Sequence, residues 1–174
     1  KYHVNDKNIG FALSINKAIK MAKGNYIVRM DSDDISYTDR IKNQINFMEK
    51  FQHIGISGMQ ADIINEDGLK IGTFNKPTKE YFIKRYIFHQ NPLIHPTFIV
   101  RRKIYEDLNF YRDLSPGQDY DLLARAYIRK INIGNSPIIG IKWRAVNTSI
   151  SHSKKKAYKK FFITSKIREM INRK

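Results

Sequence analysis

Residues Tyr26–Asp34 read Tyr-Ile-Val-Arg-Met-Asp-Ser-Asp-Asp and join a short apolar segment directly to three carboxylates. The apolar part predicts a strand, and strand ends are where open α/β sheets bind their ligands. Acidic groups that are packed together repel one another unless a cation, or the donors of a ligand, neutralises them. The stretch therefore predicts a metal site at the end of a strand.

A helix is predicted on the N-terminal side of this strand, over residues 10–23. Apolar residues recur there at helical spacing, and Gly24 stands where a C-terminal cap is expected. The chain opens on what reads as the end of a strand, and strand-helix-strand order implies a parallel crossover sheet. We therefore expect an α/β domain whose first strand is missing from this chain.

Further elements are predicted after the acids. Ser36 or Thr38 is expected to cap a helix that runs to about Phe51. The turn at residues 65–68 predicts a hairpin, because Gly68 readily adopts the positive φ that such turns need. The hairpin strands are residues 54–64 and 69–74, and they are followed by a helix after Pro77, a strand over 93–101, a helix over 118–130 and a strand over 138–146.

The composition is that of a globular domain, with 41% hydrophobic and 12% aromatic residues among 174. The chain has no cysteine, which excludes disulfides, zinc–thiolate sites and thiol nucleophiles. A reducing compartment such as the cytoplasm is therefore favoured. No apolar run approaches the roughly 20 residues that a membrane span needs.

The net charge of +16 is compatible with nucleic acid, an anionic membrane or a phosphorylated substrate as a partner. From residue 152 to 174, nine Lys or Arg stand against the single acid Glu169, so about half of the surplus lies in this segment. We expect residues 1–150 to form the domain and residues 151–174 to form a basic amphipathic helix. That helix either lies on the inner face of the cell membrane or packs its aromatic face on the domain.

Several short motifs follow one another in a particular order and spacing. They are Asn8-x-Gly10, Asn16, Ala22-x-Gly24-x-Tyr26-Ile27, the run from Arg29 to Ile35, Arg40 and Gln44, and later Asn91-Pro92, His95-Pro96, the run from Gly117 to Leu122, and Arg125. The first group resembles the nucleotide-sugar half of bacterial family 2 glycosyltransferases, and the later group resembles the acceptor half. The likeness covers roughly residues 5–130.

The resemblance implies a GT-A fold, a Rossmann-like α/β domain that binds a nucleotide sugar on a mixed, mainly parallel sheet. It also implies a DxD motif formed by Asp31 and Asp33, with Mn²⁺ or Mg²⁺ as the cofactor. Asp33 would be the more direct metal ligand, and Asp31 would hold the ribose or the water shell of the metal. The alternative is that the acids only favour the N-terminal end of the following helix, which explains Asp34 equally well.

By the same resemblance, Asp119 is the catalytic base that takes a proton from the acceptor hydroxyl. The family has a Glu-Asp pair at the start of a helix, and here Gln118-Asp119 stands in its place. Pro116-Gly117 supplies the turn before that helix. The alternative role for Asp119 is that of a helix N-cap.

Other residues are expected to bind the donor. The resemblance places Asn8, Gly10 and Asn16 near the base and ribose of the nucleotide, although Asn8 and Gly10 are equally explained as part of a strand-to-helix turn. His95 is expected to bond a sugar or phosphate as a neutral imidazole, and a structural role is the alternative. Arg29 is expected to pair with phosphate, or else to balance the charge of the acids.

The expected function is metal-dependent, inverting transfer of a sugar from a nucleotide-sugar donor to a hydroxyl of a saccharide or lipid-linked acceptor, in surface polysaccharide or lipopolysaccharide assembly. Trp143-Arg144 does not reproduce the Gln-x-x-Arg-Trp signature of processive members, so a non-processive, hexosyltransferase-like enzyme is expected. The alternative is a basic module without enzymatic activity that binds nucleic acid or an anionic membrane. That module explains the charge but not the acidic strand end, so no nucleic-acid partner is expected.

Overall fold

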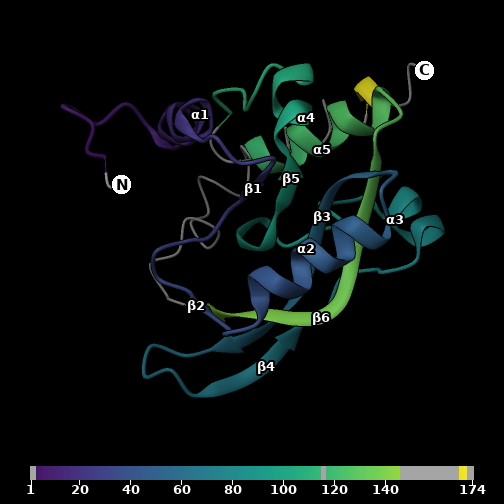
Figure 1. The fold of residues 1–174 in the computed structure, drawn as a ribbon. Coiled ribbons are helices and arrows are strands. Elements are labelled where there is room, and N and C mark those ends of the chain that lie inside the picture. Colours follow the sequence, from purple (N-terminus) through teal and green to yellow (C-terminus); the bar gives the residue numbers. More distant parts are fainter. Residues whose placement is uncertain (1–2, 115–116, 146–168, 172–174) are drawn as a thin grey trace.

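The structure is a computed structural model that describes residues 3–114, 117–145 and 169–171. Figure 1 shows how its elements are arranged. The helices are α1 (Phe11–Met21), α2 (Arg40–Lys50), α3 (Glu80–Tyr86), α4 (Arg102–Asp107), α5 (Gln118–Ile128) and the 3₁₀ helix η1 (His95–Thr97). The strands are β1 (Tyr26–Val28), β2 (Ile35–Ser36), β3 (Ile54–Ile64), β4 (Lys70–Phe74), β5 (Ile99–Arg101) and β6 (Asn132–Arg144).

The strands form one mixed sheet in the order β1-β5-β3-β6-β2, and β4 pairs with β3 outside this path. Among the described strands, only β3 and β6 pair in parallel, so the expected mixed sheet is confirmed but its pairs are mainly antiparallel rather than mainly parallel. Two of the four antiparallel pairs involve β5, which is inserted between β1 and β3 and runs opposite to both, and the other two are the β3–β4 hairpin and the pair of β2 with β6. β1, β3 and β6 still share one direction.

β6 returns the chain to the acidic segment. Its first part pairs with β3, and its last part also pairs with β2, where Ile35 faces Lys142 and Ser36 faces Ile141. Figure 1 shows the segment between β1 and β2 descending along this side of the sheet to the end of β6. The acids at residues 31–34 are therefore held beside the C-terminal end of β6.

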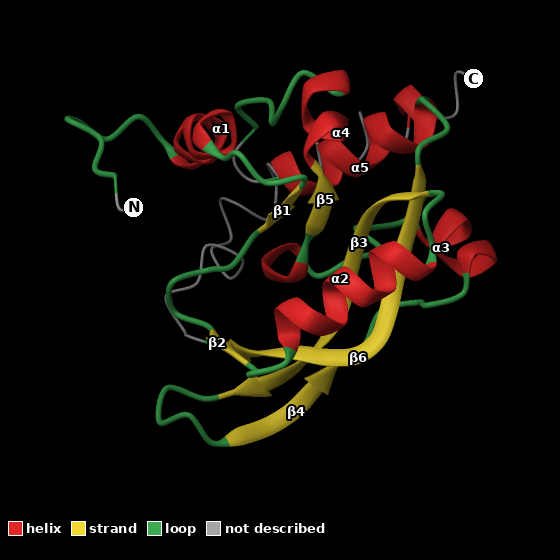
Figure 2. Ribbon diagram, in the orientation of Figure 1, coloured by secondary structure: helices red, strands yellow, loops and turns green. Residues whose placement is uncertain are grey.

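Helices cover both faces of the sheet, and Figure 2 shows α2 crossing one of them. On that face, Met48 of α2 packs with Ile54 and Ile99. On the other face, α1, α3, α4 and α5 pack on a larger cluster that includes Ile56 and Val100. Ile99 and Val100 belong to different clusters because successive side chains of a strand point to opposite faces. Each such buried side chain contributes about 1.5–3 kcal/mol relative to an exposed one.

The predicted basic helix over residues 151–174 falls largely outside the described residues. Of that segment, residues 169–171 are described as helical, and Met170 and the buried Ile171 pack on the larger cluster. For these residues the contact favours packing on the domain over insertion into a membrane. None of the described helices has the length and apolar character that crossing a bilayer requires.

Local signals predicted several elements correctly and misplaced others. The hairpin is confirmed, and Gly68 has a φ of 83°. Gly24 is not the C-cap of α1, because the helix ends earlier and Ala22 caps it in an extended conformation. The predicted strand over 93–101 is divided into η1 and β5, since Pro96 has no N–H to offer to a sheet ladder.

Candidate metal and catalytic site

Three carboxylates follow β1 and lie close together. One oxygen from each of Asp31, Asp33 and Asp34 lies within 4.8 Å of the others. Two ligand oxygens on opposite sides of a Mg²⁺ ion are separated by roughly 4.2 Å, and carboxylate oxygens are ligands that Mg²⁺ and Mn²⁺ prefer. The cluster therefore has the donor atoms, and nearly the spacing, of a divalent-cation site.

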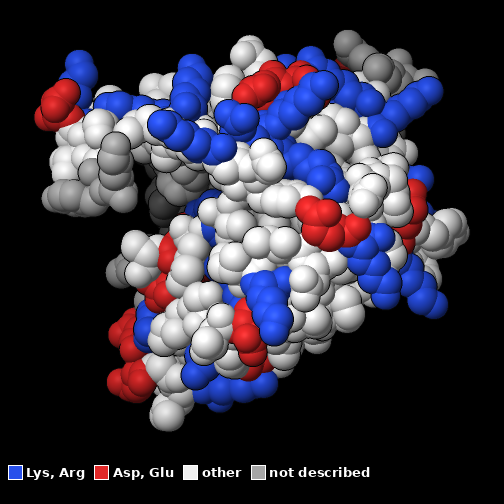
Figure 3. Space-filling model, in the orientation of Figure 1, with Lys and Arg blue, Asp and Glu red and all other residues white. Residues whose placement is uncertain are grey.

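The surface charge near this region differs from that of the whole chain. Figure 3 shows acidic side chains along the edge that carries β2 and the β3–β4 turn, whereas basic side chains dominate around α1 and α4. Glu66 and Asp67 of that turn are exposed. The net charge of +16 thus describes the chain as a whole and not the acidic edge.

Asp34 is the most buried of the three acids, with 7% of its surface exposed. Its Oδ1 accepts a 3.0 Å hydrogen bond from the backbone N–H of Arg144, and its Oδ2 is buried with no hydrogen-bond partner among the described residues. Burial raises the pKa of Asp34 to about 6, so its ionised form is costly in the fold. A buried oxygen without a partner fits a bound cation, which would supply the missing interaction.

Arg29 and Asp31 form an ion pair at the start of the same loop. The Arg29 side chain is 9% exposed, and its guanidinium carbon lies 5.4 Å from the ring centroid of Phe11. Burial is the main cause that raises the pKa of Asp31; Arg29 opposes it, and the charges of Asp33 and Asp119 add to it. Arg29 thus balances the acids, while its Nε and Nη1 have no hydrogen-bond partner among the described residues. Its contact with phosphate stays a prediction.

Arg144, the last residue of β6, connects the acidic loop, residues 29–34 between β1 and β2, to the β3–β4 turn. Its Nε donates to the backbone oxygen of Asp33 at 3.0 Å, and its Nη1 donates to the backbone oxygens of Asn65 and Glu66 at 3.0 and 2.7 Å. These bonds hold the backbone of the loop and leave the exposed side chain of Asp33 available to a ligand. Sequence reasoning missed this role, because the partners of Arg144 are far away in the chain.

Arg40 and Gln44, which carry part of the resemblance, are both buried in α2. The Nη2 of Arg40 donates to the backbone oxygens of Arg29 at 2.5 Å and Pro96 at 2.7 Å, and the Nε2 of Gln44 donates to that of Thr97 at 2.6 Å. Burial lowers the pKa of Arg40 to about 10, so the guanidinium stays charged at neutral pH. α2 therefore joins the segment that follows β1 to η1.

Asp119 lies in the first turn of α5. Gly117, with a φ of 113°, is the N-cap of this helix and no side-chain capping bond is present, so the N-cap alternative for Asp119 is not supported. The Oδ2 of Asp119 accepts a 2.5 Å hydrogen bond from Nδ2 of Asn91, a residue that sequence reasoning gave no role of its own. After burial and the charge of Asp33, the negative charge of Asp119 also raises the pKa of Asp31. The predicted base is thus within electrostatic reach of the predicted metal site.

His95 packs among aromatic rings in η1. Its Nε2 lies 3.0 Å from the hydroxyl oxygen of Tyr111, and its ring contacts those of Phe11 and Phe98. Burial lowers the pKa of His95 well below its usual value, so the imidazole is neutral at physiological pH. These contacts give His95 a structural role, and its contact with a sugar or phosphate stays a prediction.

The residues expected near the nucleotide begin α1. The Oδ1 of Asn8 accepts the backbone N–H of Gly10 at 2.9 Å, and Gly10 is the N-cap of α1 with a φ of 82°. The side chain of Asn16 makes two hydrogen bonds with the backbone of Tyr111, of 2.8 and 3.0 Å. These bonds are structural, so the predicted donor contacts of the three residues stay predictions.

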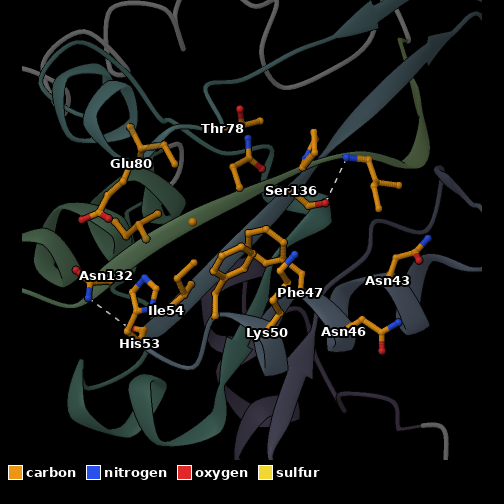
Figure 4. A pocket seen from close by; sticks show the side chains of 17 residues that line it. Asn43, Asn46, Phe47, Lys50, His53, Ile54, Thr78, Glu80, Asn132 and Ser136 are labelled. Atoms are coloured by element: carbon orange, nitrogen blue, oxygen red, sulfur yellow. Dashed lines mark hydrogen bonds between the residues drawn. The ribbon is translucent and has the colours of Figure 1, made fainter.

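A cavity of about 770 Å³ lies between α2, α3 and the first half of β6. Figure 4 shows Asn43, Asn46, Phe47 and Lys50 of α2 along one side and Ser136 of β6 near its middle. None of the predicted metal, donor or catalytic residues lines this cavity. The acidic cluster and the cavity are therefore separate features of the domain.

Residues 1–108 match the family model described as Glycosyl transferase family 2. The chain belongs to this family. The acids Asp31 and Asp33 of this glycosyltransferase family chain lie within the matched range, and Asp119 lies beyond it.

Curated relatives of this family 2 chain are also named glycosyltransferases. An uncharacterised glycosyltransferase of Methanocaldococcus jannaschii is 36% identical over 123 residues, which are 70% of this chain and 42% of that protein. The putative glycosyltransferase EpsE of Bacillus subtilis is 29% identical and covers 71% and 44% of the two chains. The amylovoran biosynthesis glycosyltransferase AmsE of Erwinia amylovora is 26% identical and covers 80% and 52%. The chain thus spans about half the length of these relatives.

Solved structures of S. aureus TarS share the fold of this glycosyltransferase chain. TarS 1-349 in complex with UDP-GlcNAc matches with a TM-score of 0.62 at 20% sequence identity, over 83% of this chain and 42% of TarS 1-349. The complex of the same protein with UDP matches with a TM-score of 0.59 at 19% identity, over 87% and 43%. The expected GT-A type α/β fold is therefore confirmed.

Proposed function

We propose that this chain carries the donor-binding and catalytic residues of an enzyme that transfers a sugar from a nucleotide-sugar donor to a hydroxyl of a saccharide or lipid-linked acceptor. The observation that carries the proposal is the cluster of Asp31, Asp33 and Asp34, whose oxygens lie within 4.8 Å of one another while one buried oxygen has no partner among the described residues. Arg29 pairs with Asp31, and a divalent cation would neutralise the negative charge that remains on the cluster.

Asp33 and Asp31 are the proposed ligands of Mn²⁺ or Mg²⁺. When bound, this cation supplies Lewis-acid stabilisation of the negative charge that develops on the departing diphosphate. Asp33 offers an exposed carboxylate, and Arg29 orients that of Asp31 through their ion pair. Asp34 holds the loop through its bond to the backbone of Arg144.

Asp119 is the proposed base. The acceptor hydroxyl gives its proton to a carboxylate oxygen of Asp119 while the acceptor oxygen bonds to the anomeric carbon. The bond from that carbon to the diphosphate breaks, and its electron pair leaves with the diphosphate. Attack from the face opposite the leaving group inverts the anomeric centre, so a single base is sufficient and Gln118 need not be acidic.

A uridine diphosphate sugar is the proposed donor, with Asn8, Gly10, Asn16 and His95 near it. The UDP-GlcNAc and UDP complexes of S. aureus TarS support this donor class. The name of AmsE, an amylovoran biosynthesis glycosyltransferase, supports a role in polysaccharide assembly. A cytoplasmic location with electrostatic contact to the inner face of the cell membrane belongs to the proposal. The lysines within residues 151–174 support that contact, whereas Met170 and Ile171 pack on the domain rather than insert.

Calorimetric titration of the protein with UDP, in the presence and absence of Mn²⁺, tests the proposed donor site. We expect binding that needs Mn²⁺ and is lost in Asp33→Ala. Asp107→Ala is the matched control, because Asp107 is another exposed aspartate and lies in α4, outside the acidic cluster. Metal-independent, salt-sensitive binding to duplex DNA, together with no binding of UDP, would instead support the basic module.

A further inference from the structure

Asn91 holds one oxygen of the proposed base. Its Nδ2 donates a 2.5 Å hydrogen bond to Oδ2 of Asp119, and its Oδ1 accepts the backbone N–H of Leu93 at 2.9 Å. The two bonds determine the direction of the amide, because a reversed amide would place its oxygen against the carboxylate and its NH₂ group against an N–H. Nδ2 of Asn91 therefore faces Asp119.

The backbone of Asn91 is in turn anchored to the sheet. Its carbonyl oxygen accepts a hydrogen bond from Nζ of Lys76 at 2.9 Å. The backbone N–H of Lys76 donates to Oε1 of Gln60 at 2.7 Å, and Nε2 of Gln60 donates to the backbone oxygen of Ser136 at 2.8 Å. Gln60 and Ser136 are buried residues of β3 and β6, so strands of the central sheet determine where Asn91 lies.

The surroundings of Asp119 explain why such a partner is needed. Its carboxylate interacts electrostatically with Asp31, which repels it, and with His95 and Tyr111. Repulsion would turn a carboxylate without a donor away from the acidic loop. The bond from Asn91 opposes this rotation, and no hydrogen bond to Oδ1 of Asp119 is found among the described residues.

We infer that Asn91 is a positioning residue, which holds Oδ2 of Asp119 so that Oδ1 is left to receive the proton of the acceptor hydroxyl. The inference rests on the proposed function, because it assigns Asn91 a part in the same transfer. Asn91 acts through Asp119 and is not itself a catalytic residue.

Asn91→Asp tests this role most sharply. Its new carboxylate still accepts the N–H of Leu93, so the turn is kept, but the donor to Asp119 is replaced by a negative oxygen. With water as the acceptor that gives its proton to Asp119 and takes the sugar, we expect kcat for Mn²⁺-dependent UDP release from UDP-GlcNAc to fall by about 10-fold or more, with KM for the donor within about 2-fold. Asn91→Ala is expected to lose kcat to a similar extent.

Asn132→Asp is the matched control, because Nδ2 of Asn132 donates to the backbone oxygen of His53 at 3.3 Å, and the same change removes that donor at a residue outside the proposed metal and catalytic site. We expect its kcat to equal that of the wild type. A kcat of Asn91→Asp equal to that of the wild type would overturn the positioning role. Asn91 would then serve only the turn that it forms with Leu93. Absence of UDP release by the wild type would count against the proposed function instead.

A second measurement does not depend on turnover. In ¹⁵N-labelled protein, the side-chain NH₂ resonances of Asn91 are expected to shift upfield in Asp119→Ala, because the short bond to a carboxylate is lost. An unchanged backbone amide spectrum elsewhere shows that the variant is folded. Asn91 resonances that do not move would refute the inference whether or not the enzyme is active.

Discussion

The backbone N–H of Arg144 donates a 3.0 Å hydrogen bond to Oδ1 of Asp34, across 110 positions of the sequence. The side chain of Arg144 adds a bond to the backbone of Asp33 and two to the β3–β4 turn. The end of one strand thus holds the loop that carries the proposed metal ligands. Substitution of Arg144 should therefore change the affinity for the cation, although Arg144 is not a metal ligand.

Arg144→Met is expected to weaken Mn²⁺ binding in the presence of UDP by about 10-fold, which corresponds to about 1.4 kcal/mol. The variant loses three side-chain hydrogen bonds, each worth about 0.5–1.5 kcal/mol. Without them the loop that carries Asp31, Asp33 and Asp34 is less ordered, so part of this free energy is lost from cation binding. Calorimetry measures the affinity. The control is Arg129→Met, since Arg129 is an exposed arginine that donates to the backbone oxygen of Asp107. Equal losses in the two variants would contradict the role of Arg144.

Asp34→Asn is expected to stabilise the protein when metal is absent. Because burial raises the pKa of Asp34 to about 6 from 3.8, the folded state binds its proton more tightly than the unfolded state. Stability therefore falls as pH rises from about 4 through 6. In EDTA, the Tm of Asp34→Asn should exceed that of the wild type at about pH 8, and the difference should disappear only as the pH falls below about 4. A variant with the lower Tm at pH 8 would show that the ionised carboxylate stabilises the fold.

His95 should make stability depend on pH with a sign opposite to that expected for Asp34. Burial keeps its imidazole neutral in the fold, whereas an unfolded histidine takes up a proton below about pH 6.5. Stability is therefore lost as pH falls below about 6.5, with a limiting slope of about 1.4 kcal/mol per pH unit. The free energy of unfolding, measured with urea between pH 7.5 and 5.5, should change less steeply with pH in His95→Gln than in the wild type. The exposed His53 provides the control, and an equal change in slope in His53→Gln would contradict the assignment.

Arg40→Met is expected to lower the free energy of unfolding by about 3 kcal/mol. The guanidinium of Arg40 is buried and donates to the backbone oxygens of Arg29 and Pro96, and buried acceptors without donors cost about 1–3 kcal/mol each. Denaturant unfolding measures the change. Lys42→Met is the matched control because Lys42 is an exposed base in the same helix. Similar stability of the two variants would mean that the buried bonds of Arg40 contribute little.

Much of the fold was predictable because its signals are local. The turn at residues 65–68 and the apolar periodicity of α1, α2 and α5 indicate these elements without knowledge of the rest of the chain. The short α4 and β2 carried no such signal. β6 begins at Asn132 rather than Ile138, because its first part is held by parallel pairing with β3 rather than by its own pattern.

The acids of the site were predictable, but the contacts that position them were not. Asp31, Asp33 and Asp34 adjoin a strand in the sequence, so their clustering follows from local geometry. The bonds of Asn16 to Tyr111 join residues 95 positions apart, and that of Asn91 to Asp119 spans 28. Such pairs depend on how the strands are ordered in the sheet, which local patterns do not determine.

Anomalous X-ray diffraction from crystals of the protein grown with Mn²⁺ and UDP would locate the cation that Asp33 and Asp31 are proposed to bind. We expect a manganese peak within about 2–2.5 Å of carboxylate oxygens of Asp33 and Asp31, with the diphosphate of UDP on its other side. A manganese ion bound elsewhere, with UDP in place and these two carboxylates directed away from its phosphates, would contradict this proposal.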